Sequence, residues 1–197
     1  MVIMINKIGV LTSGGDAPGM NAAIRGVTRY AIEKGLEVTG IVRGYEGLLS
    51  HEIMPLNRRS VGAIIHRGGT MLRTARCLEF LEEETQKKAA AYIREQEMDA
   101  LVVIGGDGSM RGAQALSRLG IPTVVIPGTI DNDMGGTEYT VGFDTAVNTV
   151  LESVNKIRDT AFSHDRVAVI EVIGRHAGFI ALYAGMAAGA EAVLVPR

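Results

Sequence analysis

Residues 127–133, with the sequence PGTIDND, carry the side chains best suited to chemistry. They follow an apolar run at 122–126 of the kind that forms a buried parallel strand. In open α/β sheets, ligands bind just past the carboxyl ends of the strands. Asp131 and Asp133 on such a turn could hold Mg²⁺ or take a proton from a hydroxyl. An ordinary surface turn is the alternative, because Asp and Asn are common turn residues.

Two glycine-rich turns favour a phosphate ligand. Residues 13–21, SGGDAPGMN, and residues 105–109, GGDGS, each stand between an apolar run and a helical pattern. In such a unit, free backbone N–H groups and a helix N-terminus face an anion. Asp107 stands where it could bind the Mg²⁺ of the phosphates. Neither turn matches a Rossmann or Walker A pattern, and a tight turn that needs glycine only for its backbone angles is the alternative.

Cationic and hydroxyl side chains also gather at residues 66–77, which contain HRGGT and TARC on a predicted loop and suit phosphate contact. Cys77 is expected to be a packed small residue, because no His partner is evident nearby. Arg25 and Arg29 lie at i and i+4 on a predicted helix, so their guanidinium groups share one face. Solvated surface arginines are the ordinary explanation, and a second phosphate site is the alternative.

An alternating framework must position these residues. The sequence predicts strands at 8–12, 37–42, 100–104, 122–126 and 167–173. It predicts one helix that ends near residue 34, three helices at 79–96, 109–119 and 142–162, and a last helix from the turn at 174–178 to residue 188. Residues 44–47 are predicted to form a turn. This alternation predicts an α/β fold with a doubly wound, mostly parallel sheet, helices on both faces and right-handed crossovers.

Composition narrows the class of protein. The 197 residues are 47% hydrophobic and 21% charged, so the chain can bury a sizeable core and is not disordered. A net charge of −2 gives no general basic surface for nucleic acid or a membrane. No apolar run approaches the roughly 20 residues that span a bilayer. The single cysteine excludes a disulfide within the chain and fits a reducing, cytoplasmic location.

Taken together, GVLTSGGDAPGMNAAIRG, HRGGT, TARC, VVIGGDGS, PGTIDND, IRDT, SHDR and EVIGRHAG resemble the bacterial ATP-dependent 6-phosphofructokinases over essentially the whole chain. The resemblance implies transfer of the ATP γ-phosphoryl group to the 1-hydroxyl of fructose 6-phosphate, in glycolysis. It implies a nucleotide-binding domain at residues 1–140 and the start of a sugar-phosphate-binding domain at 141–197.

The resemblance also implies roles for individual residues. Asp131 would be the general base, Thr129 and Asp133 would help to place the substrate and the metal, and Arg175 and Gly15 would complete the catalytic set. Asp107 and Asp133 would hold Mg²⁺. The ATP site would comprise Gly15, Tyr45, Arg76, Cys77, Gly106, Asp107, Gly108, Ser109 and Gly112. The sugar site would comprise Thr129, Ile130, Asp131, Arg166, Ile173, Gly174 and Arg175, with Arg166 reaching a neighbouring subunit's site.

Regulation and assembly follow from the same resemblance. The family is usually a homotetramer with an effector site for ADP or phosphoenolpyruvate between subunits. The positions that match this site are Arg25, Arg29, Arg58, Arg158, Gly189 and Glu191.

Some positions distinguish this chain within the family. Gly108 and Gly128 stand where the diphosphate-dependent branch typically has Asp and Lys, so ATP is the expected donor. Ile173 replaces a usual Met, and Leu81 replaces a basic residue near the adenine. Family members continue well past residue 197, so the sugar half is expected to be incomplete. A non-catalytic nucleotide-binding or assembly module is therefore the alternative function, and a GGDG kinase acting on NAD or a lipid hydroxyl is a weaker one.

Overall fold

The computed structural model describes residues 4–196, and its contacts divide the chain between Gly128 and Thr129 into two compact units. The division precedes the loop at residues 129–140, which the sequence interpretation placed in the first domain. This loop folds back on itself, since Thr140 Oγ1 donates a hydrogen bond to the Thr129 carbonyl at 2.6 Å. The functional assignment of the two domains stays a prediction.

A mostly parallel sheet is the framework, as predicted from the alternation of strands and helices. β1 pairs in parallel with β2 and β4, and β4 pairs in parallel with β5. The apolar runs that form β1, β2 and β4 are largely buried, as strands covered by helices require, whereas β5 is mostly half-buried. The strands are β1 (Lys7–Ser13), β2 (Glu37–Ile41), β3 (Ile53–Leu56), β4 (Ala100–Gly105), β5 (Thr123–Thr129) and β6 (Val141–Gly142), in the order β3-β2-β1-β4-β5-β6.

The strand β3 is an antiparallel member of this mostly parallel sheet, and the sequence did not predict it. It runs antiparallel to β2, with Thr39 opposite Pro55, and forms one edge of the sheet. The sequence predicts no strand here, because four residues that include a proline read as a loop. Proline is accommodated because an edge strand has one side without a neighbour.

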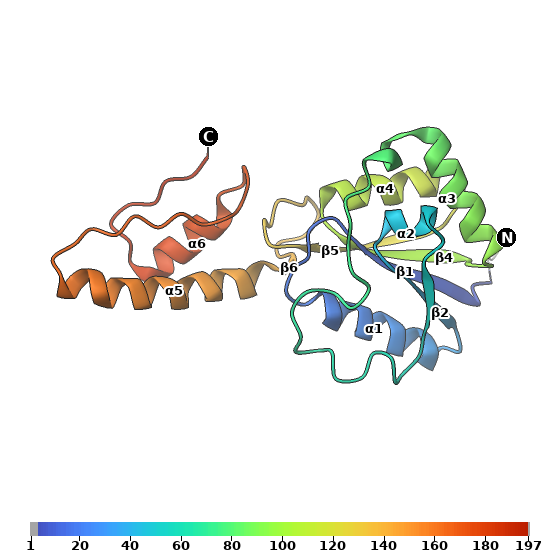
Figure 1. Cartoon of the computed structure of the whole chain (residues 1–197), viewed down its shortest axis with the longest axis horizontal. Coiled ribbons are helices and arrows are strands. Elements are labelled where there is room, and N and C mark those ends of the chain that lie inside the picture. The colour runs from blue at the N-terminus through green and yellow to red at the C-terminus, as the bar shows by residue number, and fades with distance from the viewer. Residues whose placement is uncertain (1–3, 197) are drawn as a thin grey trace. The chain divides into compact units, whose positions relative to one another are not determined.

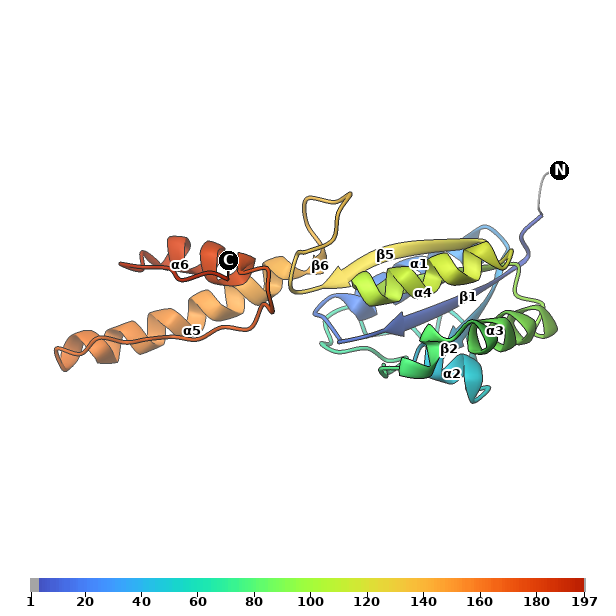
Figure 2. The same ribbon diagram turned by 90° about the horizontal axis from the view of Figure 1, so that it is seen from above.

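Helices cover both faces of the sheet, as predicted. Figure 1 shows α1 (Met20–Glu33) on one face, with α2, α3 and α4 on the other. Seen from above, α4 covers the middle of the sheet (Figure 2). Leu11 of β1 and Leu101 of β4 are fully buried in the core beneath the second group of helices. These helices are α2 (Tyr45–Leu49), where the sequence predicts only a turn, the 3₁₀ helix η1 (Leu78–Leu81), α3 (Glu83–Glu95) and α4 (Asp107–Arg118).

The second unit is built on two helices, α5 (Phe143–Ser163) and α6 (Phe179–Ala188), which pack along each other (Figure 1). The Phe143 and Tyr183 rings meet edge to face, with centroids 5.3 Å apart. Arg158 Nη1 donates to the Ala188 carbonyl at 2.5 Å, which satisfies a carbonyl at the C-terminus of α6. No helix within residues 4–196 is long and apolar enough to cross a bilayer.

The strand predicted at residues 167–173 is wrong. This segment is irregular, and Val167 and Val169 are each 94% exposed. An apolar run becomes a strand only where a neighbour accepts its backbone hydrogen bonds, and none of the six strands pairs with it. The ladder partner that such an apolar run needs is absent from the described residues.

Candidate functional site

The two glycine-rich turns meet at the place where the sheet reverses its order. From β1 the chain moves outward to β2 on one side, and from β4 it moves outward to β5 on the other. β1 and β4 are adjacent, and Ser13 at the end of β1 lies opposite Gly105 at the end of β4. Ligands of open α/β sheets bind outside the carboxyl ends of strands at such a reversal. The sheet therefore brings both turns to one candidate binding site.

The glycines of these turns differ in what surrounds them. A Cβ atom on Gly15 or Gly108 would meet no heavy atom within 4 Å. A Cβ on Gly105 would lie 2.6 Å from the Ser13 carbonyl oxygen, and one on Gly112 would lie 2.6 Å from Tyr45 Cε2. Gly15 and Gly108 thus border open space into which a phosphate could move. Gly105 and Gly112 instead let segments of the protein approach one another.

The head of α4 can receive an anion and its cation. Gly106 precedes the helix, and Asp107 is its first residue. The exposed Asp107 carboxylate lies 3.0 Å from Arg111 Nη2, a surface pair of little energetic weight that leaves the carboxylate available. Mg²⁺ in phosphate sites is held by one or two carboxylates together with phosphates and waters. A single exposed carboxylate fits this pattern, and residues 4–196 contain no cluster of three His, Cys, Asp or Glu side chains that would cage a metal unaided.

Side-chain hydrogen bonds hold the TARC segment against the first glycine-rich turn. Thr74 Oγ1 donates to the Gly14 carbonyl at 2.6 Å, and Thr12 Oγ1 donates to the Arg73 carbonyl at 2.7 Å. Arg76 follows with its side chain exposed, so its guanidinium is free to reach a ligand. Burial raises the pKa of the Cys77 thiol and the neighbouring Glu46 raises it further, which keeps the thiol neutral and fits a packing role.

Asn21 holds another part of the same loop and was missed as a site residue. Its buried Oδ1 accepts from the Met71 N–H at 2.7 Å, and its Nδ2 donates to the carbonyls of Arg67 and Gly68 at 3.1 and 3.2 Å. The sequence shows an asparagine at a helix start, which reads as a local turn residue, so no pattern indicates this long-range contact.

Tyr45 does not present its ring to a ligand. The residue is 4% exposed, and its ring stacks on Phe80 with centroids 4.2 Å apart. Its hydroxyl donates to the Ser109 carbonyl at 2.6 Å. Burial raises the pKa of the hydroxyl, so it remains a donor at every ordinary pH.

In the second unit, Asp131 combines burial with a cationic neighbour. The residue is 7% exposed, and its Oδ2 lies 3.4 Å from Arg175 Nε. Burial raises the pKa of Asp131, the charge of Arg175 lowers it, and the charge of Asp133 raises it, with a net rise. The Asp131 N–H donates to Thr129 Oγ1 at 3.3 Å. The structure therefore brings three residues of the predicted catalytic set together.

Asn132, between the two predicted carboxylates, shapes the loop and was also missed. Its Oδ1 accepts from the Thr140 N–H at 2.8 Å, and its Nδ2 donates to the Glu138 carbonyl at 3.0 Å. Its φ of 52° is left-handed, a conformation that asparagine tolerates better than most residues. On either side of it, Asp131 is buried and Asp133 is exposed. The only signal in the sequence is the residue type itself.

The remaining predicted residues occupy varied surroundings. Gly174 and Arg175 form the turn before α6, and Ile130 is partly buried. Arg25 Nη1 donates to the Val61 carbonyl at 2.9 Å, so this guanidinium already has a protein partner. Gly189 follows α6 with a left-handed φ of 69°. The side chains of Arg29, Arg58, Arg166, Ile173 and Glu191 are exposed.

Comparisons with known proteins converge on one family. Residues 7–197 match the family model described as Phosphofructokinase. The chain is 64% identical over 193 residues to an ATP-dependent 6-phosphofructokinase of Clostridium acetobutylicum, covering 98% of this chain and 60% of that relative. It is 61% identical, with the same coverage, to ATP-dependent 6-phosphofructokinase 1 of Clostridium perfringens. The chain thus spans 60% of the length of these relatives.

Solved structures share the fold. Phosphofructokinase from Saccharomyces cerevisiae matches with a TM-score of 0.88 and 41% identity, covering 94% of this chain and 28% of that chain. A pyrophosphate-dependent phosphofructokinase from Nitrosospira multiformis matches with a TM-score of 0.83 at 20% identity, covering 92% of this chain and 49% of that chain, which is a likeness of fold alone.

Proposed function

Because the chain belongs to the phosphofructokinase family, we propose that it takes part in phosphoryl transfer from MgATP to the 1-hydroxyl of fructose 6-phosphate. The products are fructose 1,6-bisphosphate and ADP. The observation that carries the proposal is Asp131, a buried carboxylate just past β5 that is paired with Arg175.

Asp131 acts as the base in this proposal. Phosphoryl transfer asks little covalent chemistry of a protein and depends on positioning, charge and a group that takes the proton of the attacking hydroxyl. Burial raises the pKa of Asp131, which makes its carboxylate a stronger base than that of an exposed Asp. Arg175 opposes this rise and so favours the ionised form that a base requires.

The turns after β1 and β4 bind the nucleotide in this proposal. Backbone amides near Gly15 and Gly108 and the positive end of the α4 dipole favour its phosphates, and Arg76 reaches them as a cation. Following the family resemblance, Asp107 and Asp133 would hold Mg²⁺, which would supply positive charge to the phosphoryl oxygens.

The wider proposal follows the family resemblance. ADP and phosphoenolpyruvate are effectors, the arginine and glutamate positions of the predicted effector site receive them, and the assembled protein is a cytoplasmic homotetramer of glycolysis. The second candidate function is nucleotide binding without catalysis. It is favoured by one observation, namely that every residue assigned to the ATP site lies within the first unit.

A chimera tests the catalytic proposal. The 197-residue chain is joined to the remaining sequence of the Clostridium acetobutylicum relative, and fructose 6-phosphate-dependent ADP release is measured with MgATP. Replacing Asp131 by Asn should lower kcat by about 10² to 10⁴-fold, the usual contribution of a general base. ATP affinity, measured by calorimetry, should remain the same.

Glu138→Gln is the matched control, because it removes a carboxylate from an exposed position in the same loop. It should leave turnover unchanged. Full turnover by Asp131→Asn would refute the assigned base. A folded chimera that binds MgATP without turnover would favour the second candidate.

A further inference from the structure

We infer that Tyr45 is a positioning residue of the nucleotide site, whose buried hydroxyl fixes the two glycine-rich turns rather than contacting the nucleotide. This inference rests on the proposed function, because it assigns a role within the proposed ATP site. It is carried by a chain of hydrogen bonds and by the packing of the tyrosine ring.

Two buried hydrogen bonds connect three strand ends. Tyr45 Oη donates to the Ser109 carbonyl at 2.6 Å, and Ser109 Oγ donates to the Ser13 carbonyl at 2.9 Å. Ser13 ends β1, Tyr45 follows β2, and Ser109 follows β4. Since β2, β1 and β4 are neighbours in the sheet, the pair of bonds ties together the carboxyl ends of three adjacent strands. We name this chain the Tyr45 relay.

The relay stands directly behind the open glycines. Ser109 follows Gly108, and Ser13 stands two residues before Gly15, so each bonded residue is close in sequence to a glycine that borders open space. Displacement of the Ser109 or Ser13 carbonyl would move the peptide groups next to Gly15 and Gly108, which border that space. The relay can therefore set the positions of anion-binding amides without touching the anion.

The surrounding residues hold the Tyr45 ring in one position. Phe80 stacks on its face with an interplanar angle of 18°. Gly112 supplies the space at its edge, because a Cβ there would lie 2.8 Å from Tyr45 Oη. With the residue 4% exposed and its only proton committed to Ser109, no ring face or hydroxyl donor remains for a base.

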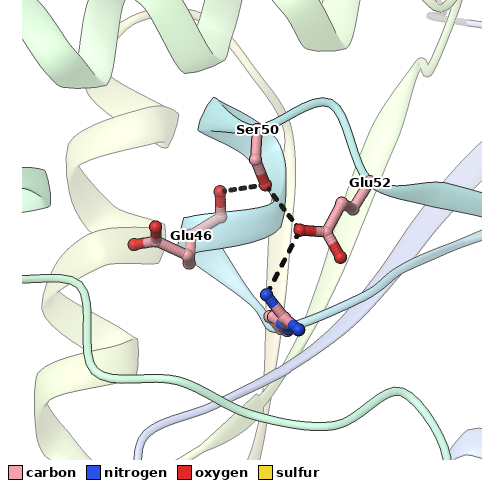
Figure 3. A network of polar contacts seen from close by, with 4 residues as sticks. Glu46, Ser50 and Glu52 are labelled. Atoms are coloured by element: carbon pink, nitrogen blue, oxygen red, sulfur yellow. Dashed lines mark hydrogen bonds and ion pairs between the residues drawn. The ribbon is translucent and has the colours of Figure 1, made fainter.

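The helix that carries Tyr45 is also held at its other end. Figure 3 shows Ser50, whose Oγ lies 3.0 Å from the Glu46 carbonyl oxygen and 3.1 Å from Glu52 Oε1, the two acceptors that share its one proton. Glu52 Oε1 lies 3.5 Å from Arg43 Nη1, on the residue that precedes Gly44 and α2. These exposed contacts are individually weak, but they close the segment from 43 to 52 around α2. Tyr45 therefore extends from a helix whose flanking residues contact one another.

Tyr45→Phe removes only the hydroxyl, and Tyr92→Phe is the matched control. Tyr92 is a tyrosine of the same core, 6% exposed, whose hydroxyl makes no hydrogen bond within residues 4–196. We measure two properties of the 197-residue chain: backbone amide hydrogen exchange without nucleotide, and MgATP affinity by calorimetry. Thermal unfolding of both variants provides the comparison of overall stability.

The expected result is local. Tyr45→Phe should speed amide exchange at residues 13–15 and 106–109 more than elsewhere, and should weaken MgATP binding by about three- to tenfold, the usual weight of one hydrogen bond. Tyr92→Phe should change neither property. A purely structural role would instead raise exchange throughout the unit and lower the unfolding temperature without the local pattern.

Each contrary result has a distinct meaning. Unchanged exchange in the two turns, or unchanged MgATP affinity where the unaltered chain binds, would overturn the inference about Tyr45. Absence of MgATP binding by the unaltered chain would overturn the proposed function instead. The exchange measurement would then still decide whether Tyr45 fixes the turns.

Discussion

Asp131 and Asp133 carry the same carboxylate and stand two residues apart, yet their surroundings differ. Asp131 is buried beside Arg175, whereas Asp133 is exposed. Asn132 lies between them in a left-handed conformation. Its side chain makes hydrogen bonds to backbone groups of residues 138 and 140. Chemistry at this loop is therefore set by burial, which the residue types alone do not show.

Burial of Asp131 predicts a trade of stability for function. Its pKa is raised in the folded chain, so the stability that this group contributes is complete below its unfolded pKa and is lost as the pH rises through its folded pKa. Because asparagine does not ionise, the Asp131→Asn protein does not lose this stability as the pH rises. Asp131→Asn should therefore raise the free energy of unfolding at about pH 7 more than at about pH 3, below the ordinary Asp pKa.

Urea unfolding of both proteins at the two pH values measures this difference. Glu138→Gln, at an exposed position of the same loop, should show no comparable dependence. If Asp131→Asn raised the free energy of unfolding more at low pH than at neutral pH, the charge of Arg175, and not burial, would dominate the pKa of Asp131.

At the scale of elements, α1 is tied to a distant loop by the side chain of Asn21. Asn21 uses its amide to satisfy three backbone groups of the 67–71 loop. On the same helix, Thr28 is buried, and its Oγ1 has no hydrogen-bond partner within the described residues. One buried polar residue of this helix is thus fully engaged while the other is unpartnered.

We expect opposite effects from removing these two polar groups. Asn21→Ala strands buried backbone groups and should lower the free energy of unfolding by about 1–3 kcal/mol. Thr28→Val removes an unpartnered hydroxyl at similar volume and should be neutral or stabilising. Chemical denaturation of the 197-residue chain measures both. Equal destabilisation by the two variants would show that volume, not hydrogen bonding, governs this helix.

The sequence predicts elements well where the local pattern is sufficient. β1 and β4 agree with their predicted positions to within two residues, because an apolar run and a glycine turn define each. The predictions for β3 and for the irregular segment at 167–173 are wrong for one reason, because pairing with a neighbouring strand decides whether a short run becomes a strand. Likewise, the spacing of Asp131 and Asp133 predicts a site, but the Asn21 and Tyr45 contacts span 46 to 64 residues and leave no local pattern.

At the scale of the whole molecule, the first unit contains its own core. The main cluster of buried side chains runs from Leu11 to Ile121, and the pairing of β1 with β2 and β4 lies within the same residues. Both glycine-rich turns and the Tyr45 relay belong to it. The first unit has the features of an independently folding domain.

A protein of residues 1–128 should therefore fold and still bind MgATP, but less tightly than the 197-residue chain, because it lacks Asp133, one of the two proposed Mg²⁺ ligands. Thermal unfolding followed by circular dichroism tests the first expectation, through a single cooperative transition. Calorimetry tests the second. An unfolded product would show that the second unit is needed for folding, whereas a folded product that binds no MgATP would place an essential part of the nucleotide site beyond Gly128.

Pro55 of β3 affects how readily copies of this protein can associate through the edge of the sheet. A sheet margin offers unpaired N–H and C=O groups to any extended chain nearby, and this template effect underlies much aggregation. Here the edge strand β3 is only four residues long and antiparallel to β2. It contains Pro55, which has no backbone N–H to donate to an incoming strand. The strand that the apolar pattern failed to indicate is thus a poor starting point for fibril growth.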